Sequence, residues 1–265
     1  MWSGEWKTIV VDYIGANAGK PLHIGHICTP SVGQAVCNIY RHLGYDVIGD
    51  SHFGDWGGIF GKLIYAWKYE GEEIIYMQLE NIIGVQNTIW LRNKGADWTR
   101  NERFDILFGE FWIDFILALY QSFHYLTGLK GKEEQDTKEE KSREEFKKIT
   151  EWDLENIELW KKFTAISGME IEKKLGLLNI KATYNIGESF YEWLNLPRPN
   201  NEDYPDLQYN MKDIVRELIE KWVATQNEDG SVGVIFPEET KIPSCVLQKK
   251  DGTGLYLTSD LAAIK

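Results

Sequence analysis

Two strand-like segments and a helix-like segment within the first fifty residues constrain the fold more than any other feature of the sequence. Residues 8–13 are a largely apolar run with β-branched residues, which is typical of a buried parallel strand. Residues 45–48 form a second such run. A helix pattern lies between them, so we expect a right-handed βαβ unit at the start of an α/β fold.

The expected helix has recognisable ends. Thr29 is a suitable N-cap, Pro30 suits the first helical position, and Gly44 suits the stop. Helical spacing predicts that it buries a stripe of branched side chains. These are Val32, Val36, Ile39 and Leu43.

The loop between the first strand and this helix carries chemistry. After the small residues 14–19 come Lys20, His23, Gly25 and His26. A helix N-terminus, imidazole donors and a lysine together favour a phosphate, and Gly25 leaves room for a ribose or base. Such a site suits attack by a carboxylate on the α-phosphate of ATP, because alignment and charge stabilisation are all that the reaction requires.

Two plainer interpretations compete at this loop. Isolated histidines usually lie at the surface or are satisfied inside a core. A pair three residues apart could also bind zinc, with Cys28 or His52 as a further ligand. The strand-loop-helix context favours phosphate binding over both, and we predict no metal site.

The segment 52–58 follows the second strand, at the edge where open α/β sheets bind ligands. We leave the role of His52 open. One interpretation of Asp55 and Trp56 is that they contact a ligand. The alternative is that Asp55 caps the next helix and Trp56 packs against the loop.

Length, net charge and cysteine content exclude few classes of protein. The chain has 265 residues and a net charge of −12, which disfavours a uniformly basic nucleic-acid binder without excluding a local basic patch. Three cysteines without a C-x-x-C pair favour a reduced, cytoplasmic compartment. The best apolar run, 111–120, is interrupted by Asp114 and is shorter than the ~20 residues of a membrane span, so we expect a soluble protein.

The rest of the chain predicts an inserted helical segment. We expect the first part of the nucleotide-binding domain at 1–70, a mainly helical insertion at 71–181, and a return to the domain at 182–265. Within the insertion, 132–151 alternates charges at i,i+4 spacing and predicts a solvated helix.

The third part of the chain is predicted to mix strands, loops and helices. We expect strands at 182–186, 232–236, 245–250 and 254–258, a proline-rich loop at 196–206, and helices at 211–225 and from Asp260. Because the chain stops soon after that last helix begins, we expect it to be a fragment.

Four blocks in order resemble arginyl-tRNA synthetase, a class I aminoacyl-tRNA synthetase. They are 17–26, which contains the HIGH signature, 52–57 with 60–61, 186–191, and 251–262. HIGH alone would indicate only a superfamily of nucleotidyltransferases. The resemblance implies an incomplete Rossmann-like class I synthetase fold with a helical insertion. It also implies a parent enzyme that joins arginine and ATP to arginyl-adenylate and then charges tRNA(Arg).

The resemblance also assigns residues. His23, Gly25 and His26, with Lys20, would bind ATP, and the two histidines would act catalytically; Mg²⁺ is expected on the ATP phosphates. Asn17 would hold the backbone groups of arginine. Glu188, Tyr256 and Asp260 would surround its guanidinium, which suits paired carboxylates and an aromatic face. Without the resemblance, Asp260 would be interpreted as a helix N-cap.

The sequence departs from the family at Cys28 and Ser259, where arginine is common, so their roles stay open. The second, lysine-bearing class I signature is absent, and we expect the isolated chain to be inactive in charging. A non-catalytic arginine- or nucleotide-binding module and a free-standing nucleotidyltransferase remain alternatives. The expected partners are arginine, ATP and tRNA(Arg), with no membrane and no DNA.

Overall fold

The structure is a computed structural model that describes residues 4, 6–94, 98–125, 132–192, 209–250 and 252–265. The chain divides into two compact units, Met1–Asn185 and Ile186–Lys265. The expected loop at 196–206 lies outside the described residues. The three-part division into 1–70, 71–181 and 182–265 stays a prediction.

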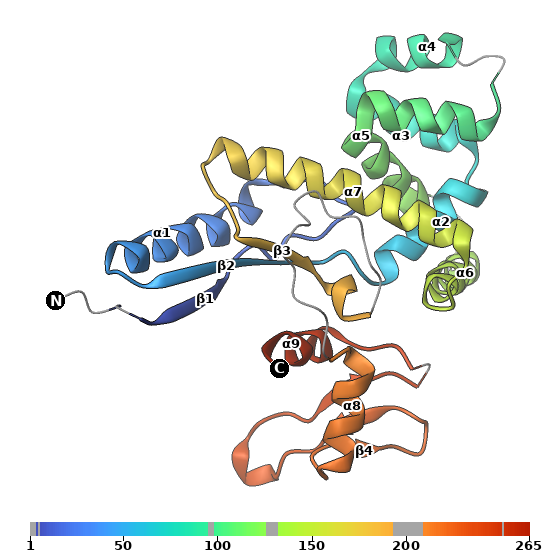
Figure 1. Ribbon diagram of the computed structural model, residues 1–265. Helices are drawn as coiled ribbons and strands as arrows, with labels where there is room; N and C mark the ends of the chain where they lie inside the picture. The colour runs from blue at the N-terminus through green and yellow to red at the C-terminus, as the bar shows by residue number, and fades with distance from the viewer. Residues whose placement is uncertain (1–3, 5, 95–97, 126–131, 193–208, 251) are drawn as a thin grey trace. The chain divides into compact units, whose positions relative to one another are not determined.

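The first unit is built on a sheet with the order β1-β2-β3. Its strands are β1 (Thr8–Asp12), β2 (Asp46–Phe53) and β3 (Tyr184–Gly187), and the border between the units falls within β3. β1 and β2 pair in parallel, with Val10 opposite Ile48. Together with the connecting helix they form the expected βαβ unit (Figure 1). β2 is longer than predicted, so His52 lies inside the strand and not in the loop after it.

Helix α1 (Cys28–His42) buries a different face from the predicted one. Its buried residues are Pro30, Gly33 and Cys37, whereas Val32 and Ile39 are 60% and 58% exposed. Leu43 is exposed as well, and Val36 is half-buried. The N-cap is Ile27 and not Thr29, although the helix does end before Gly44, which has a φ of +84°.

The reason lies in Tyr13, which fills the space between α1 and β2. A Cβ added at Gly33 would lie 2.1 Å from the Cβ of Tyr13, and one added at Gly49 would lie 2.9 Å from its ring. Close packing around this ring therefore selects the small residues of α1 for the inner face. The stripe of branched apolar residues on α1 therefore predicts the wrong buried face.

In the described residues between β2 and β3 the chain forms six helices. They are α2 (Gly58–Tyr69), α3 (Glu72–Ile83), α4 (Val85–Lys94), α5 (Arg100–Tyr125), α6 (Lys132–Thr150) and α7 (Leu154–Leu177). Helix α7 extends from the other helices back to the sheet (Figure 1). There Ile171 and Leu175 join Tyr13, Cys37 and Val47 in one core. The helical segment and the sheet are thus packed together within the first unit.

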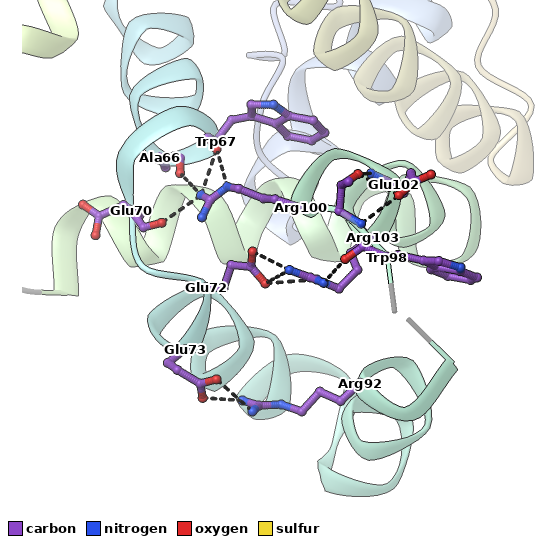
Figure 2. Close-up of polar contacts among 11 residues, drawn as sticks. Ala66, Trp67, Glu70, Glu72, Glu73, Arg92, Trp98, Arg100, Glu102 and Arg103 are labelled. Carbon is purple, nitrogen blue, oxygen red and sulfur yellow. Dashed lines mark hydrogen bonds and ion pairs between the residues drawn. The ribbon is translucent and has the colours of Figure 1, made fainter. Parts of the chain in front are cut away.

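Arginines connect the helices at their ends (Figure 2). The Arg100 guanidinium donates to the carbonyl oxygens of Ala66, Trp67 and Glu70, at 2.8 to 3.3 Å. These acceptors lie at the C-terminal end of α2, where a cation also suits the helix dipole; the Ala66 carbonyl accepts from the Glu70 N–H as well. Arg103 of α5 holds Glu72 of α3 in a bidentate pair, with Nε donating to Oε2 at 3.0 Å and Nη2 to Oε1 at 2.7 Å. The two pairings connect α5 to both α2 and α3.

Helix α6 is not solvated all round, contrary to the prediction. Ser142, Phe146 and Ile149 are buried, and so are the charged residues Lys138 and Glu145. Lys138 forms an ion pair with Glu70 and donates to the carbonyl of Phe123 at 3.3 Å. Glu145 pairs with Lys148 along the helix and also with Lys68 of α2, so the buried charges of α6 have partners on other elements as well as on α6.

Helix α5 is long and apolar enough to cross a membrane by length and composition alone. It is kinked at Phe111 and Trp112. Phe104, Phe115 and Leu119 are fully buried in the first unit, so this helix contributes to a protein core.

The described part of the second unit contains four helical segments and a small sheet. Its helices are η3 (Glu188–Glu192), α8 (Met211–Glu220), η4 (Glu238–Thr240) and α9 (Tyr256–Ile264). Its antiparallel strands are β4 (Thr225–Gln226), β5 (Val232–Val234) and β6 (Cys245–Gln248). The expected strand at 254–258 is wrong: only Gly254 bridges to Gln248, and the helix begins at Tyr256.

The buried Lys138–Glu70 ion pair generates a stability prediction. We expect Lys138→Met to lower the free energy of unfolding by about 3 to 5 kcal/mol, because it leaves the Glu70 carboxylate buried without its cation. Adding Glu70→Gln should recover part of that loss. Urea denaturation followed by tryptophan fluorescence measures both effects.

The matched control is Lys62→Met. Lys62 pairs with Glu139 across the same two helices, but both side chains are about a quarter exposed. We expect a loss of at most about 1 kcal/mol there. Equal losses in the two lysine variants would contradict the role assigned to burial.

Candidate active site

The loop after β1 and the loop after β2 are joined by the backbone. Asn17 and Gly54 form a parallel bridge, in which the Ala18 N–H donates to the Gly54 carbonyl and the Gly54 N–H to the Ala16 carbonyl, both at 2.9 Å. A Cβ at Gly54 would lie 2.3 Å from the Asn17 side-chain oxygen. Glycine at position 54 therefore lets the Asn17 side chain occupy the space between the loops.

Gly19 fixes the next part of the loop. It has a φ of +83°, which glycine adopts without strain, and it packs against Ile59 and Leu63 of α2. Its buried N–H donates to the hydroxyl of Ser167 on α7 at 2.9 Å. Lys20 follows, with its Nζ 4.5 Å from the centre of the Tyr120 ring on α5.

The two histidines cap each other's backbone in the short helix η1 (Ile24–His26). The Gly25 N–H donates to His23 Nδ1 at 3.1 Å, and the His23 N–H donates to His26 Nδ1 at 3.2 Å. Because each Nδ1 accepts a hydrogen bond, a neutral ring carries its proton on Nε2. The loop thus holds two imidazoles whose Nε2–H groups are the donors left for a ligand.

The surroundings of His26 disfavour the protonated form of its imidazole. Burial lowers the pKa of the His26 imidazole below its usual value, and the neighbouring His23 imidazole and Lys20 ammonium group lower it further. The two rings lie 3.7 Å apart between centres. Two adjacent imidazoles and a lysine therefore make an environment that disfavours another proton and suits an anion.

In the loop after β2, the side chain of Trp56 is packed into the core. Trp56 is 8% exposed and makes edge contacts with Phe146 and Trp160 at 5.1 and 5.5 Å, which confirms the packing interpretation. The Asp55 carbonyl accepts from the Trp160 indole at 2.8 Å. Asp55 is not the cap of α2, because the N-cap is Gly57 and no side chain caps that helix.

The expected guanidinium-binding residues lie in the second unit. Glu188 opens η3, Tyr256 opens α9, and Asp260 follows Tyr256 by one helical turn on the same face. η3 packs against α9, which brings the elements that carry these residues together. Tyr256 is 67% exposed and Asp260 is exposed.

Two features of α9 bear on the predictions. Asp260 is not an N-cap, since the cap position is Leu255. Ser259 is buried and its hydroxyl donates to the Tyr256 carbonyl at 2.7 Å, so it serves the helix itself. That Asn17 and the histidine loop join Glu188, Tyr256 and Asp260 in one site stays a prediction.

The part of the chain that the structure describes contains no group of three or more histidine, cysteine or acidic side chains that could hold an ion. Cys28, the candidate third zinc ligand, is exposed at the start of α1.

Sequence reasoning did not find Ser167 and Tyr120, which contact the loop from α7 and α5. Ser167 lies in a run of small and apolar residues, and Tyr120 in an apolar helix. Nothing in either local pattern separates these two residues from ordinary core positions.

A parallel sheet with a histidine loop at its edge defines the catalytic fold of a class I tRNA synthetase. The family model described as "tRNA synthetases class I (R), catalytic domain" matches residues 1–265. The chain belongs to this family, the arginine branch of the class I catalytic domains.

Its relatives agree. Over 257 residues the chain is 31% identical to the arginine–tRNA ligase of Fusobacterium nucleatum, and over 260 residues it is 30% identical to that of Alkaliphilus metalliredigens. The matches cover 97% and 98% of this chain and 36% of each relative. The chain thus spans about a third of their length.

Solved structures show the same fold. The arginyl-tRNA synthetase of Plasmodium falciparum superposes with a TM-score of 0.61 at 21% identity, covering 98% of this chain and 35% of that one. The Thermus thermophilus arginyl-tRNA synthetase gives 0.56 at 16% identity, with 98% and 36% covered.

The mutual capping of the histidines generates a pH prediction. We expect His26 to titrate below 6.5, and Lys20→Gln to raise its pKa because a neighbouring positive charge is removed. NMR titration of the His26 ring measures this. A depressed pKa means that the unfolded chain binds the proton first, so this group's contribution to stability falls as pH drops through 6.5 towards the folded pKa.

Lys7→Gln is the control, because Lys7 is exposed and is not among the charges that act on His26. It should leave the titration unchanged. A His26 pKa at or above 6.5 in the unmodified chain would rule out the assigned environment.

Proposed function

We propose that this chain forms the part of an arginine–tRNA ligase that binds ATP and arginine. The parent enzyme would activate arginine as arginyl-adenylate and transfer it to tRNA(Arg) in protein biosynthesis, which takes place in the cytoplasm. The observation that carries the proposal is the family match along the whole chain, in which the histidine loop retains a geometry suited to phosphate.

ATP would lie at the histidine loop. The arginine carboxylate attacks the α-phosphate, a bond to the carboxylate oxygen forms, and pyrophosphate leaves with the electrons of the broken P–O bond. His23 and His26 would donate their Nε2–H groups to the phosphates, while Lys20 and the N-terminal end of α1 supply positive charge. Gly25 would keep the approach open.

Mg²⁺ would arrive on the nucleotide. The described residues offer no cluster of carboxylates for it. Mg²⁺ bound to ATP phosphates partly neutralises their charge, and this needs no protein cage.

Arginine would be recognised at both ends. Glu188 and Asp260 would accept hydrogen bonds from the guanidinium, and Tyr256 offers a ring for it to stack on. Asn17 would hold the amino or carboxylate group. This arrangement also rejects citrulline, whose neutral head would leave two carboxylates without a cation.

The proposal predicts selective arginine binding. By calorimetric titration, we expect this chain to bind arginine at least about tenfold more tightly than citrulline, and Glu188→Gln or Asp260→Asn to weaken arginine binding about tenfold or more, because a charge-assisted hydrogen bond is lost.

Glu238→Gln is the matched control, since Glu238 is an exposed acid of the same unit on η4. It should bind arginine like the unmodified chain. Equal affinity for arginine and citrulline would refute the pocket.

A further inference from the structure

We propose that Ser167 and Tyr120 are positioning residues for the histidine loop. They come from helices α7 and α5, in the segment between β2 and β3. They hold Gly19 and Lys20 in the position that binding of a nucleoside triphosphate requires. The role towards nucleotide rests on the proposed function; the anchoring of the loop does not.

Ser167 holds the loop through a buried hydrogen bond. Its side chain is fully buried, its hydroxyl donates to the Phe163 carbonyl at 2.8 Å, and its oxygen accepts from the Gly19 N–H at 2.9 Å. The bond to Phe163 fixes where the hydroxyl hydrogen points, so the lone pairs face Gly19. Ser167 thereby connects α7 directly to the loop backbone.

The backbone at Gly19 makes this contact necessary. A φ of +83° turns its N–H towards α7, while Ile59 and Leu63 lie against its Cα. A buried N–H without an acceptor is costly, so loss of the Ser167 hydroxyl favours another loop conformation. Lys20 and the histidines follow immediately in the chain and would move with Gly19.

Tyr120 holds Lys20 without neutralising it. The lysine Nζ lies 4.5 Å from the ring centre, within the range of a cation–π interaction. A tyrosine ring carries no formal negative charge, so it does not neutralise the ammonium group. An aromatic face orients the ammonium group and leaves its charge available to a phosphate.

The two contacts have different chemistry but one result. A hydrogen bond sets the loop backbone and a ring sets the lysine that follows it, and both come from helices that make up no part of the βαβ unit. The helical segment therefore shapes the phosphate site, beyond covering the sheet.

The first experiment measures the loop without any ligand. We expect hydrogen exchange of the Gly19 amide in this chain to accelerate about two- to tenfold in Ser167→Ala, the range set by the loss of one hydrogen bond. Ser167→Cys keeps the volume but offers a poor acceptor, so it should accelerate exchange too. Ser167→Thr, which keeps the hydroxyl, should restore slow exchange.

Ser122→Ala is the matched control. Ser122 is equally buried in a helix, and its hydroxyl donates to the Leu119 carbonyl at 2.8 Å. It removes a similar hydrogen bond and should leave Gly19 exchange unchanged. Unchanged exchange in both Ser167→Ala and Ser167→Cys would overturn the anchoring role of Ser167.

The second experiment measures nucleotide affinity. We expect Tyr120→Leu to weaken ATP binding about 2- to 30-fold while adenosine binding stays constant, because only the phosphates need Lys20. Tyr120→Phe keeps the ring and should bind ATP like the unmodified chain. Equal ATP affinity in the two variants, or a parallel loss for adenosine, would overturn the role of Tyr120.

The two experiments separate this inference from the proposed function. If the unmodified chain fails to bind ATP, the proposed ATP site and the role of Tyr120 towards nucleotide fail together. Gly19 exchange still decides whether Ser167 anchors the loop.

Discussion

The parallel bridge between Asn17 and Gly54 is the constraint on which the site depends. β1 and β2 are in register over five residue pairs, and the bridge joins the loops beyond the strands with the pairing shifted by one residue. A one-residue slip in the pairing of β1 and β2 would reverse which side chains face the core. It would also move the Asn17 side chain out of the space that Gly54, which lacks a side chain, leaves open. The site is therefore fixed first by strand pairing, and its side chains come second.

The helical segment supports that register by packing and by charge. Ile171 and Leu175 of α7 join the core of the sheet, and Arg100 closes the C-terminal end of α2, which follows the Gly54 loop. Charges inside such a segment are expensive unless they are paired. Glu70, which directly follows α2, and Lys138 of α6 meet this condition, so losing either partner would leave the other charge buried and unpaired.

The sequence predicted those parts of the site that depend on local order. The histidine loop, the strand before it and the helix after it follow from short-range pattern, and so does α9 as a helix containing Asp260. The buried face of α1 did not follow, because Tyr13 from another strand selects Gly33. Nor did the buried face of α6, since Lys138 and Glu145 also find partners outside this helix. Both predictions failed because of tertiary contacts between residues far apart in the sequence, which a short stretch of sequence does not reveal.

In the histidine loop, different residues determine the shape of the backbone and the positive charge. His23 and His26 each use Nδ1 to cap the backbone, so these rings shape the loop and reach a ligand only through Nε2. A ring that must stay neutral to keep its cap cannot also supply permanent positive charge, and the lowered pKa of His26 agrees with this. At the proposed ATP site the positive charge would come from Lys20 and from the N-terminal end of α1. A flexible lysine is useful for this only if something orients it, and Tyr120 on a distant helix does so.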